Sequence, residues 1–141
     1  MLHCPVCRDS KMIILELDAI EVDYCPVCGG VWLDAGEMGI LLGDAAKEEK
    51  VLQCLHAPEA PCQEQRFPCP ICRKRMTKCA MEDPLPVLII DRCPSGHGLW
   101  FDAGELALLL SSPLCKADSR VVSLVREMFA THIPTMQGRI P

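Results

Sequence analysis

The stretch Cys25-Pro-Val-Cys-Gly-Gly-Val-Trp-Leu-Asp-Ala-Gly-Glu37 decides how this chain folds, because a close version of it occurs again further along. The second version, Cys93-Pro-Ser-Gly-His-Gly-Leu-Trp-Phe-Asp-Ala-Gly-Glu105, keeps the tryptophan and the acidic ending. A Cys-Pro-x-Cys motif precedes each version, at residues 4–7 and at residues 69–72. The chain therefore contains two copies of one small module.

Each copy supplies four side chains with the spacing of a tetrahedral zinc site. The two ligand pairs are separated by 17 residues in the first copy and by 20 in the second. In the second copy Gly96 stands where the first has Cys28, so the fourth ligand is His97, one residue later. Two such ordered pairs are much stronger evidence for a metal site than one pair alone. The sequence predicts two Zn²⁺ ions per chain, held by Cys4, Cys7, Cys25 and Cys28 and by Cys69, Cys72, Cys93 and His97.

The size of the modules explains why a metal is needed. Of the 141 residues, each copy takes about 40, and chains of that size seldom bury enough surface to fold without metals or disulfides. The N-terminus has no signal-peptide pattern, and no stretch approaches the roughly 18 apolar residues of a membrane span. We therefore expect a cytoplasmic protein without a membrane segment, in which paired cysteines are metal-binding thiolates.

The predicted fold class is a small metal-stabilised α+β protein. Runs of β-forming residues predict a β-hairpin in each copy, which brings the two ligand pairs to one metal ion. A third strand and a short helix follow, and an acidic residue three positions before a glutamate predicts a capping box at the helix start. The expected strands cover residues 12–17, 20–24 and 30–33 and, in the second copy, 76–81 and 87–91; the expected helices cover 35–42 and 103–110.

Each copy resembles the transcription-factor-IIB-type zinc ribbon family, a group of small, mostly prokaryotic proteins. The resemblance rests on the Cys-Pro-x-Cys motif, the second ligand pair and the Trp-Leu-Asp-x-Gly-Glu ending, and it covers residues 3–42 and 68–110. It implies the eight ligands named above, with His97 as a familiar variant. It also implies a link to transcription.

Four segments follow from this organisation. The helical linker has an amphipathic pattern up to residue 56, and the tail has an apolar helical stripe from Val121 to Phe129 with Pro134 beyond its end. We expect that stripe to dock on the core. The segments are zinc ribbon 1 at residues 1–43, the linker at 44–66, zinc ribbon 2 at 67–112 and the helical C-terminal tail at 113–141.

Three pairs of conspicuous residues have a structural explanation. Trp32 and Trp100 are the largest apolar side chains of their modules, so we expect them in the core and not in a platform for stacking bases. Asp34 with Glu37, and the equivalent pair in the second copy, are explained by helix capping without a catalytic role.

The predicted function is that of a non-catalytic zinc protein acting as a protein-interaction module, with regulation as one such role. Four protein ligands leave a zinc ion no open position for water or substrate, so we expect no enzyme activity. The net charge of −5, near −8 with zinc bound, disfavours nucleic acid. The leucine-rich helices at 40–42 and 106–110 need something to pack against, which could be their own hairpin, the other copy or a second chain in a homo-oligomer.

Three alternatives remain. A nucleic-acid-binding, transcription-associated role is suggested by the family resemblance and by one basic cluster, whose members are Arg73, Lys74, Arg75 and Lys78. A thiol redox sensor and a rubredoxin-like iron electron carrier also fit CxxC motifs, but iron suits neither His97 nor an aromatic content of 4%. The sequence assigns no role beyond that of idle or buried thiols to the remaining cysteines, Cys54, Cys62, Cys79 and Cys115. A third metal site at Cys54, His56 and Cys62 has irregular spacing and is disfavoured.

Overall fold

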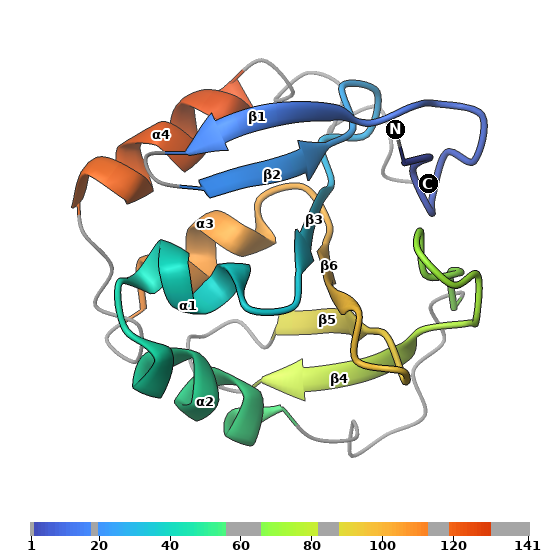
Figure 1. The fold of residues 1–141 in the computed structure, drawn as a ribbon. Helices are drawn as coiled ribbons and strands as arrows, with labels where there is room; N and C mark the ends of the chain where they lie inside the picture. Colours follow the sequence, from blue (N-terminus) through green and yellow to red (C-terminus); the bar gives the residue numbers. More distant parts are fainter. Residues whose placement is uncertain (1, 18–19, 56–65, 82–87, 113–118, 131–141) are drawn as a thin grey trace.

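The computed structural model describes residues 2–17, 20–55, 66–81, 88–112 and 119–130, which form an antiparallel sheet with four helices (Figure 1). The sheet has six strands in the order β1-β2-β3-β6-β5-β4. All the predicted strands are present within one residue of their expected limits, and the turns predicted at 18–19 and 82–86 lie outside the described residues. The strands are β1 (Ile13–Leu17), β2 (Ile20–Tyr24), β3 (Val31–Asp34), β4 (Thr77–Met81), β5 (Leu88–Arg92) and β6 (Gly98–Phe101).

The two copies meet in the middle of this sheet, where β3 pairs with β6. Trp32 lies opposite Trp100, and the flanking pairs are Val31 with Phe101 and Leu33 with Leu99. Each tryptophan thus faces its own equivalent, and each flanking residue faces the equivalent of the residue on the other side of the tryptophan, so the copies are related by a local two-fold axis close to the tryptophan pair. The sequence left the arrangement of the copies open; in the structure they share one continuous sheet.

The helices follow the strands at the predicted places. α1 (Glu37–Leu42) ends at Gly43, and α2 (Ala45–Cys54) begins after Asp44, whose side chain accepts a hydrogen bond from the backbone N–H of Ala46 at 2.8 Å. α3 (Glu105–Leu110) occupies the place of α1 in the second copy. The tail contributes α4 (Ser119–Ala130), and the rest of the predicted tail lies outside the described residues.

The predicted capping boxes form only in part, which is a correction to the sequence interpretation. Glu37 Oε1 accepts a hydrogen bond from the backbone N–H of Asp34 at 2.8 Å, as a capping box requires. The Asp34 carboxylate, however, accepts the indole N–H of Trp32 at 2.8 Å and caps no helix. A buried indole N–H needs an acceptor, and the aspartate two residues away on the strand supplies it. The cap position belongs instead to Gly36, with φ of 92°, so the helix begins two residues later than expected.

The second copy repeats this arrangement. Asp102 Oδ1 accepts the indole N–H of Trp100 at 3.2 Å, and Glu105 Oε1 accepts the backbone N–H of Asp102 at 2.9 Å. Gly104, with φ of 88°, is the cap residue of α3. In each Asp-Ala-Gly-Glu sequence the aspartate therefore holds the tryptophan indole, while the glycine and the glutamate form the start of the helix.

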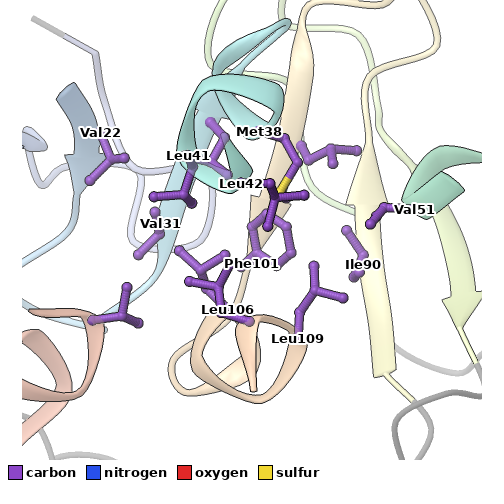
Figure 2. Packing of buried hydrophobic residues seen from close by; sticks show 14 of the residues in the cluster. Val22, Val31, Met38, Leu41, Leu42, Val51, Ile90, Phe101, Leu106 and Leu109 are labelled. Atoms are coloured by element: carbon purple, nitrogen blue, oxygen red, sulfur yellow. The ribbon is translucent and has the colours of Figure 1, made fainter. Parts of the chain in front are cut away.

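One face of the sheet carries the main hydrophobic core, which Figure 2 shows from close by. Side chains of α1 and α3 fill it, including Leu106 and Leu109, so the leucine-rich helices pack against the strands of both copies. Val121 and Val125 of α4 are buried there too, and the predicted docking of the tail helix is confirmed. Ile40 and Leu108 remain exposed on the two short helices.

The opposite face carries a second, smaller cluster. Trp32 and Trp100 lie there with no exposed surface, which confirms their predicted place in the core. Met12 and Met76 pack beside them, together with the buried cysteines Cys4, Cys25, Cys28, Cys69 and Cys93. The alternation of strand side chains explains why the tryptophans face this cluster while their neighbours face the main core. Among the described residues, no helix has the length and apolar character needed to cross a membrane.

Candidate metal centres

The hairpin of each copy brings its two ligand pairs together. Cys4 and Cys7 precede β1, while Cys25 and Cys28 lie between β2 and β3, so pairing of β1 with β2 places both turns at one end of the hairpin. Each turn is closed by a backbone hydrogen bond of 2.8 Å, from Arg8 to the carbonyl of Cys4 and from Gly29 to that of Cys25. The sulfur atoms are therefore positioned by regular backbone structure.

The first ligand set has the dimensions of a tetrahedral metal site. Its four sulfur atoms all lie within 4.8 Å of one another. The Sγ atoms of Cys4 and Cys28 are 3.6 Å apart, and those of Cys7 and Cys25 are 3.9 Å apart. A zinc ion with four Zn–S bonds of about 2.3 Å requires sulfur–sulfur distances of about 3.8 Å. The set can therefore hold a metal ion of this size with little rearrangement.

The second ligand set has the same form with one imidazole. The Sγ atoms of Cys72 and Cys93 are 3.6 Å apart, and Cys93 Sγ lies 3.4 Å from Nδ1 of His97. Mixed sulfur and nitrogen bonds of about 2.3 and 2.0 Å predict a separation of about 3.6 Å for such a pair. The structure thus brings together the same eight side chains that the spacing predicts, including the histidine that follows Gly96.

Backbone N–H groups point at several of the sulfur atoms. Cys4 Sγ accepts from Cys7 at 3.3 Å, Cys69 Sγ from Ile71 at 3.3 Å, and Cys93 Sγ from Ser95 at 3.3 Å. Hydrogen bonds of this kind stabilise thiolates and orient them toward a metal ion.

The electrostatics of the first set call for a cation. Burial, followed by repulsion from the Cys28 and Cys25 thiolates, raises the pKa of Cys7 from 9.0 to about 12. A hydrogen bond with Cys4 and burial also raise the pKa of Cys28. Crowded sulfur atoms therefore resist ionisation on their own, and a divalent cation reverses that preference by neutralising the thiolates.

Each candidate centre offers four protein side chains, enough to fill a tetrahedral shell. The cysteine and histidine donor sets are those of structural zinc sites. Within the described ranges, these two are the groups of His, Cys, Asp or Glu side chains that could hold a metal ion. The geometry and chemistry of the residues thus fit zinc.

The predicted basic cluster does not act as a unit, because Lys78 is buried. Its ammonium group lies 2.8 Å from Asp91 Oδ1 and 5.2 Å from the centre of the Phe67 ring, and the residue is only 6% exposed. The prediction that Lys78 belongs to a cluster that contacts nucleic acid is therefore wrong. The sequence pattern alone does not show whether one lysine in a strand points to solvent or to the protein interior. Here the lysine is turned inward because Asp91 on the neighbouring strand pairs with it. Arg73, Lys74 and Arg75 are exposed.

Replacing Lys78 by methionine is expected to destabilise the fold by about 3 kcal/mol, because it leaves the Asp91 carboxylate buried without its cation. Lys74→Met is the matched control, since it removes a lysine that is exposed and whose ammonium donates to Ser95 Oγ at 3.2 Å. Chemical denaturation of the metal-loaded proteins measures both effects. A Lys78→Met protein as stable as Lys74→Met would contradict the assigned role of the buried pair.

The remaining cysteines do not add a third centre within the described residues. Cys54 is exposed at the end of α2, and Cys79 is buried on β4, where burial raises the pKa of its thiol. The prediction of a buried thiol is confirmed for Cys79, and Cys54 belongs to neither ligand group of the described residues. Cys62 and Cys115 lie outside the described residues, as does His56, so the disfavoured third site is not described.

One residue of interest is not singled out by the metal-binding pattern. Arg8 follows Cys7 directly and occupies the place in the first copy that Arg73 occupies in the second. Both arginines stand immediately after a Cys-Pro-x-Cys motif, where the turn favours glycine. Comparing the two copies position by position would have revealed this shared departure.

The class defined by these features is a two-copy α+β protein with two cysteine-rich centres that suit zinc. Residues 3–43 match the family described as transcription factor zinc-finger, a zinc ribbon of the transcription-factor-IIB type. The match covers the first copy and ends before the second. Comparison with curated proteins gives no match. Comparison with solved structures gives none either.

Proposed function

We propose that this chain is a non-catalytic protein that binds two Zn²⁺ ions, one in each copy, and recognises another protein. The observation that carries the proposal is the closed form of both centres, each with four protein ligands drawn from one hairpin. A structural metal of this kind supports a surface and offers no open position to a substrate. The second copy is a zinc ribbon as well on this proposal, supported by its repeated sequence and its own ligand cluster.

Zinc is favoured over iron by the second centre. A rubredoxin-like iron site uses four thiolates, whereas His97 Nδ1 takes one of the four places here. Three thiolates and one imidazole are an ordinary donor set for structural zinc. A redox role for the same cysteines has no separate support from the described residues.

A protein partner is supported by a hollow of about 310 Å³ beside the first copy. Ile14, 56% exposed, and Ile71, 43% exposed, line it from the two copies. Leu2 and Val22 add to the apolar part of the lining, and four acidic side chains contribute as well, namely Glu21, Asp23, Asp34 and Glu37. Apolar side chains surrounded by carboxylates suit a protein segment that carries both apolar and basic residues, and they repel phosphate.

The second copy shows how a basic group could sit in that hollow. Lys78 lies opposite Asp91 on the paired strands, and the equivalent positions in the first copy are Ile14 and Asp23. The first copy thus keeps the aspartate and lacks the lysine. We propose that a lysine or arginine of the partner approaches Asp23 as Lys78 approaches Asp91.

A library of randomised peptides, displayed against the zinc-loaded chain, tests this proposal. We expect enrichment of peptides that combine basic and apolar residues. Ile14→Lys is expected to weaken their binding at least tenfold, because it supplies the missing lysine within the chain and fills the hollow. Ile40→Lys, at an exposed isoleucine on α1, is the matched control and should leave binding unchanged.

The second candidate is a nucleic-acid-binding, transcription-associated role, which fits the family match equally well. Exposed Arg73, Lys74 and Arg75 favour it. The distinguishing result is salt-sensitive binding of duplex DNA that is lost when these three residues are neutralised, together with no peptide enrichment. That outcome would reverse the order of the two candidates.

A further inference from the structure

A cleft of about 330 Å³ lies between the Cys-Pro-x-Cys turns of the two copies. These turns, blue and green in Figure 1, lie at the same end of the molecule. The cleft is lined by Cys4 and Cys69, by three prolines, and by four residues that are basic in type, namely His3, Arg8, Arg73 and Arg75. Among the described residues that line it, none is an aspartate or a glutamate. The cleft therefore combines a concave shape with positive charge, in a chain whose net charge is −5.

Arg8 and Arg73 hold an unfavourable backbone conformation to be there. Their φ angles are 62° and 68°, and among the described residues they are the non-glycine residues with positive φ. The equivalent residue of the Cys25 turn is Gly29, with φ of 79°, and the Cys93 turn reverses one residue earlier, at Gly96, with φ of 81°. Glycine adopts this conformation without strain, whereas a residue with a Cβ does not. At residues 8 and 73 the backbone turn alone would thus be better served by glycine than by arginine.

The two arginine side chains are also available for a ligand. Both are exposed, and within the described part of the chain neither guanidinium forms an ion pair with a carboxylate. Arg75 is held at the edge of the cleft, since its Nη1 donates to the carbonyl of Arg66 at 2.9 Å. Strained backbone retained at two symmetric positions, with free cations pointing to one cavity, indicates a binding role for these side chains.

We propose that this cleft binds the phosphate group of a small molecule, with Arg8 and Arg73 contacting it from the two copies. Guanidinium groups present planar pairs of N–H donors that match phosphate oxygens and keep their charge at all physiological pH values. The volume admits a diphosphate or a phosphate ester with a small organic part. An extended polyanion suits the site less, because the rest of the chain is acidic and three arginines in a hollow form no continuous basic track. The proposal is independent of the protein-binding hollow, which has different lining residues.

The arginines could instead serve only to offset the charge of the thiolates that line the cleft. The two explanations differ in what a glycine substitution does. If the arginines only support the metal centres, their removal lowers zinc retention. If they bind a ligand, Arg8→Gly with Arg73→Gly relieves the backbone strain, leaves zinc in place and removes the anion site.

Calorimetric titration of the zinc-loaded full chain with pyrophosphate tests the proposal, with zinc content measured before and after. The wild-type protein should bind at low ionic strength, and the Arg8→Gly/Arg73→Gly protein should bind at least tenfold more weakly. Its melting temperature without ligand should rise by about 2 °C or more, because two left-handed positions become glycine. Arg126→Gln, at an exposed arginine of α4, is the control that should bind as the wild type does.

Four results would overturn the proposal. The first is a double variant that binds pyrophosphate as tightly as the wild-type chain, and the second is a wild-type chain that shows no binding at millimolar pyrophosphate. The third is loss of zinc from the double variant, which would assign the arginines to the metal centres. Binding that strengthens steadily with the length of an added oligonucleotide would likewise replace the small ligand by nucleic acid. None of these results bears on peptide recognition at Ile14.

Discussion

Removing zinc with a strong chelator is expected to unfold both copies of this chain. The ligand cysteines are part of the second hydrophobic cluster and pack beside Trp32 and Trp100, so the metal and that cluster stabilise one another. Structural zinc contributes about 10–16 kcal/mol in small zinc-finger peptides, which is as large as the whole stability of an ordinary domain. Tryptophan fluorescence and circular dichroism, followed during chelation, measure the loss, and elemental analysis of the untreated protein should find two zinc ions per chain.

Single substitutions separate the two centres. Cys25→Ser and Cys93→Ser should each release one zinc ion and lower the melting temperature by more than about 10 °C. The reason is that each variant keeps only three ligands: three thiolates in the first centre, or two thiolates and one imidazole in the second. Cys54→Ser is the control, because Cys54 is exposed and belongs to neither ligand set. A protein that keeps its fold without metal, or that is purified with iron, would contradict the structural role assigned to zinc.

Replacing Gly98 by alanine is expected to break the junction between the copies. An added Cβ at this position would collide with the backbone carbonyl of Leu33 and lie 2.7 Å from Cζ2 of Trp32. Neither neighbour can move freely, because one is strand backbone and the other is a fully buried ring. We expect a loss of more than about 4 kcal/mol, or failure to fold.

Gly30→Ala makes the reciprocal test, because a Cβ there would collide with the ring of Trp100. Gly43→Ala is the matched control, since no atom of the described residues lies within 4 Å of the added Cβ and the left-handed φ of 76° is what opposes it. That strain costs roughly 1 kcal/mol. Chemical denaturation of the three zinc-loaded variants gives the comparison. Equal stability of Gly98→Ala and Gly43→Ala would show that the sheet does not depend on this contact.

The ligand sets and the hairpins could be predicted because their signals are local. Cys-Pro-x-Cys fixes the turn, and a β-hairpin can only return the second pair to the first, so Cys4 and Cys25 must approach one another. The same logic finds His97 despite its one-residue displacement. Runs such as 20–24 contain enough β-formers between turn residues to locate a strand within one position.

The joining of the copies could not be predicted, because it depends on contacts between residues 68 positions apart. Gly30 and Gly98 appear in the sequence as ordinary turn glycines, although each leaves room for the tryptophan of the other copy. The roles of Lys78 and Asp34 could not be predicted for a related reason. A polar side chain can cap a helix, meet solvent or satisfy a buried group, and only the packed structure decides among these.

The pairing of β3 with β6 has a consequence for single-copy chains. Because each strand meets its own counterpart across the two-fold axis, a chain with one copy would expose β3 as an open sheet edge. Two such chains could close the same six-stranded sheet as a symmetric homodimer whose stability depends on concentration. When both copies belong to one chain, the stability of the sheet no longer depends on protein concentration, and the two halves can differ in sequence. Here the second half has His97 as its fourth ligand and a buried lysine opposite Asp91, whereas the first half has a fourth cysteine and an isoleucine opposite Asp23.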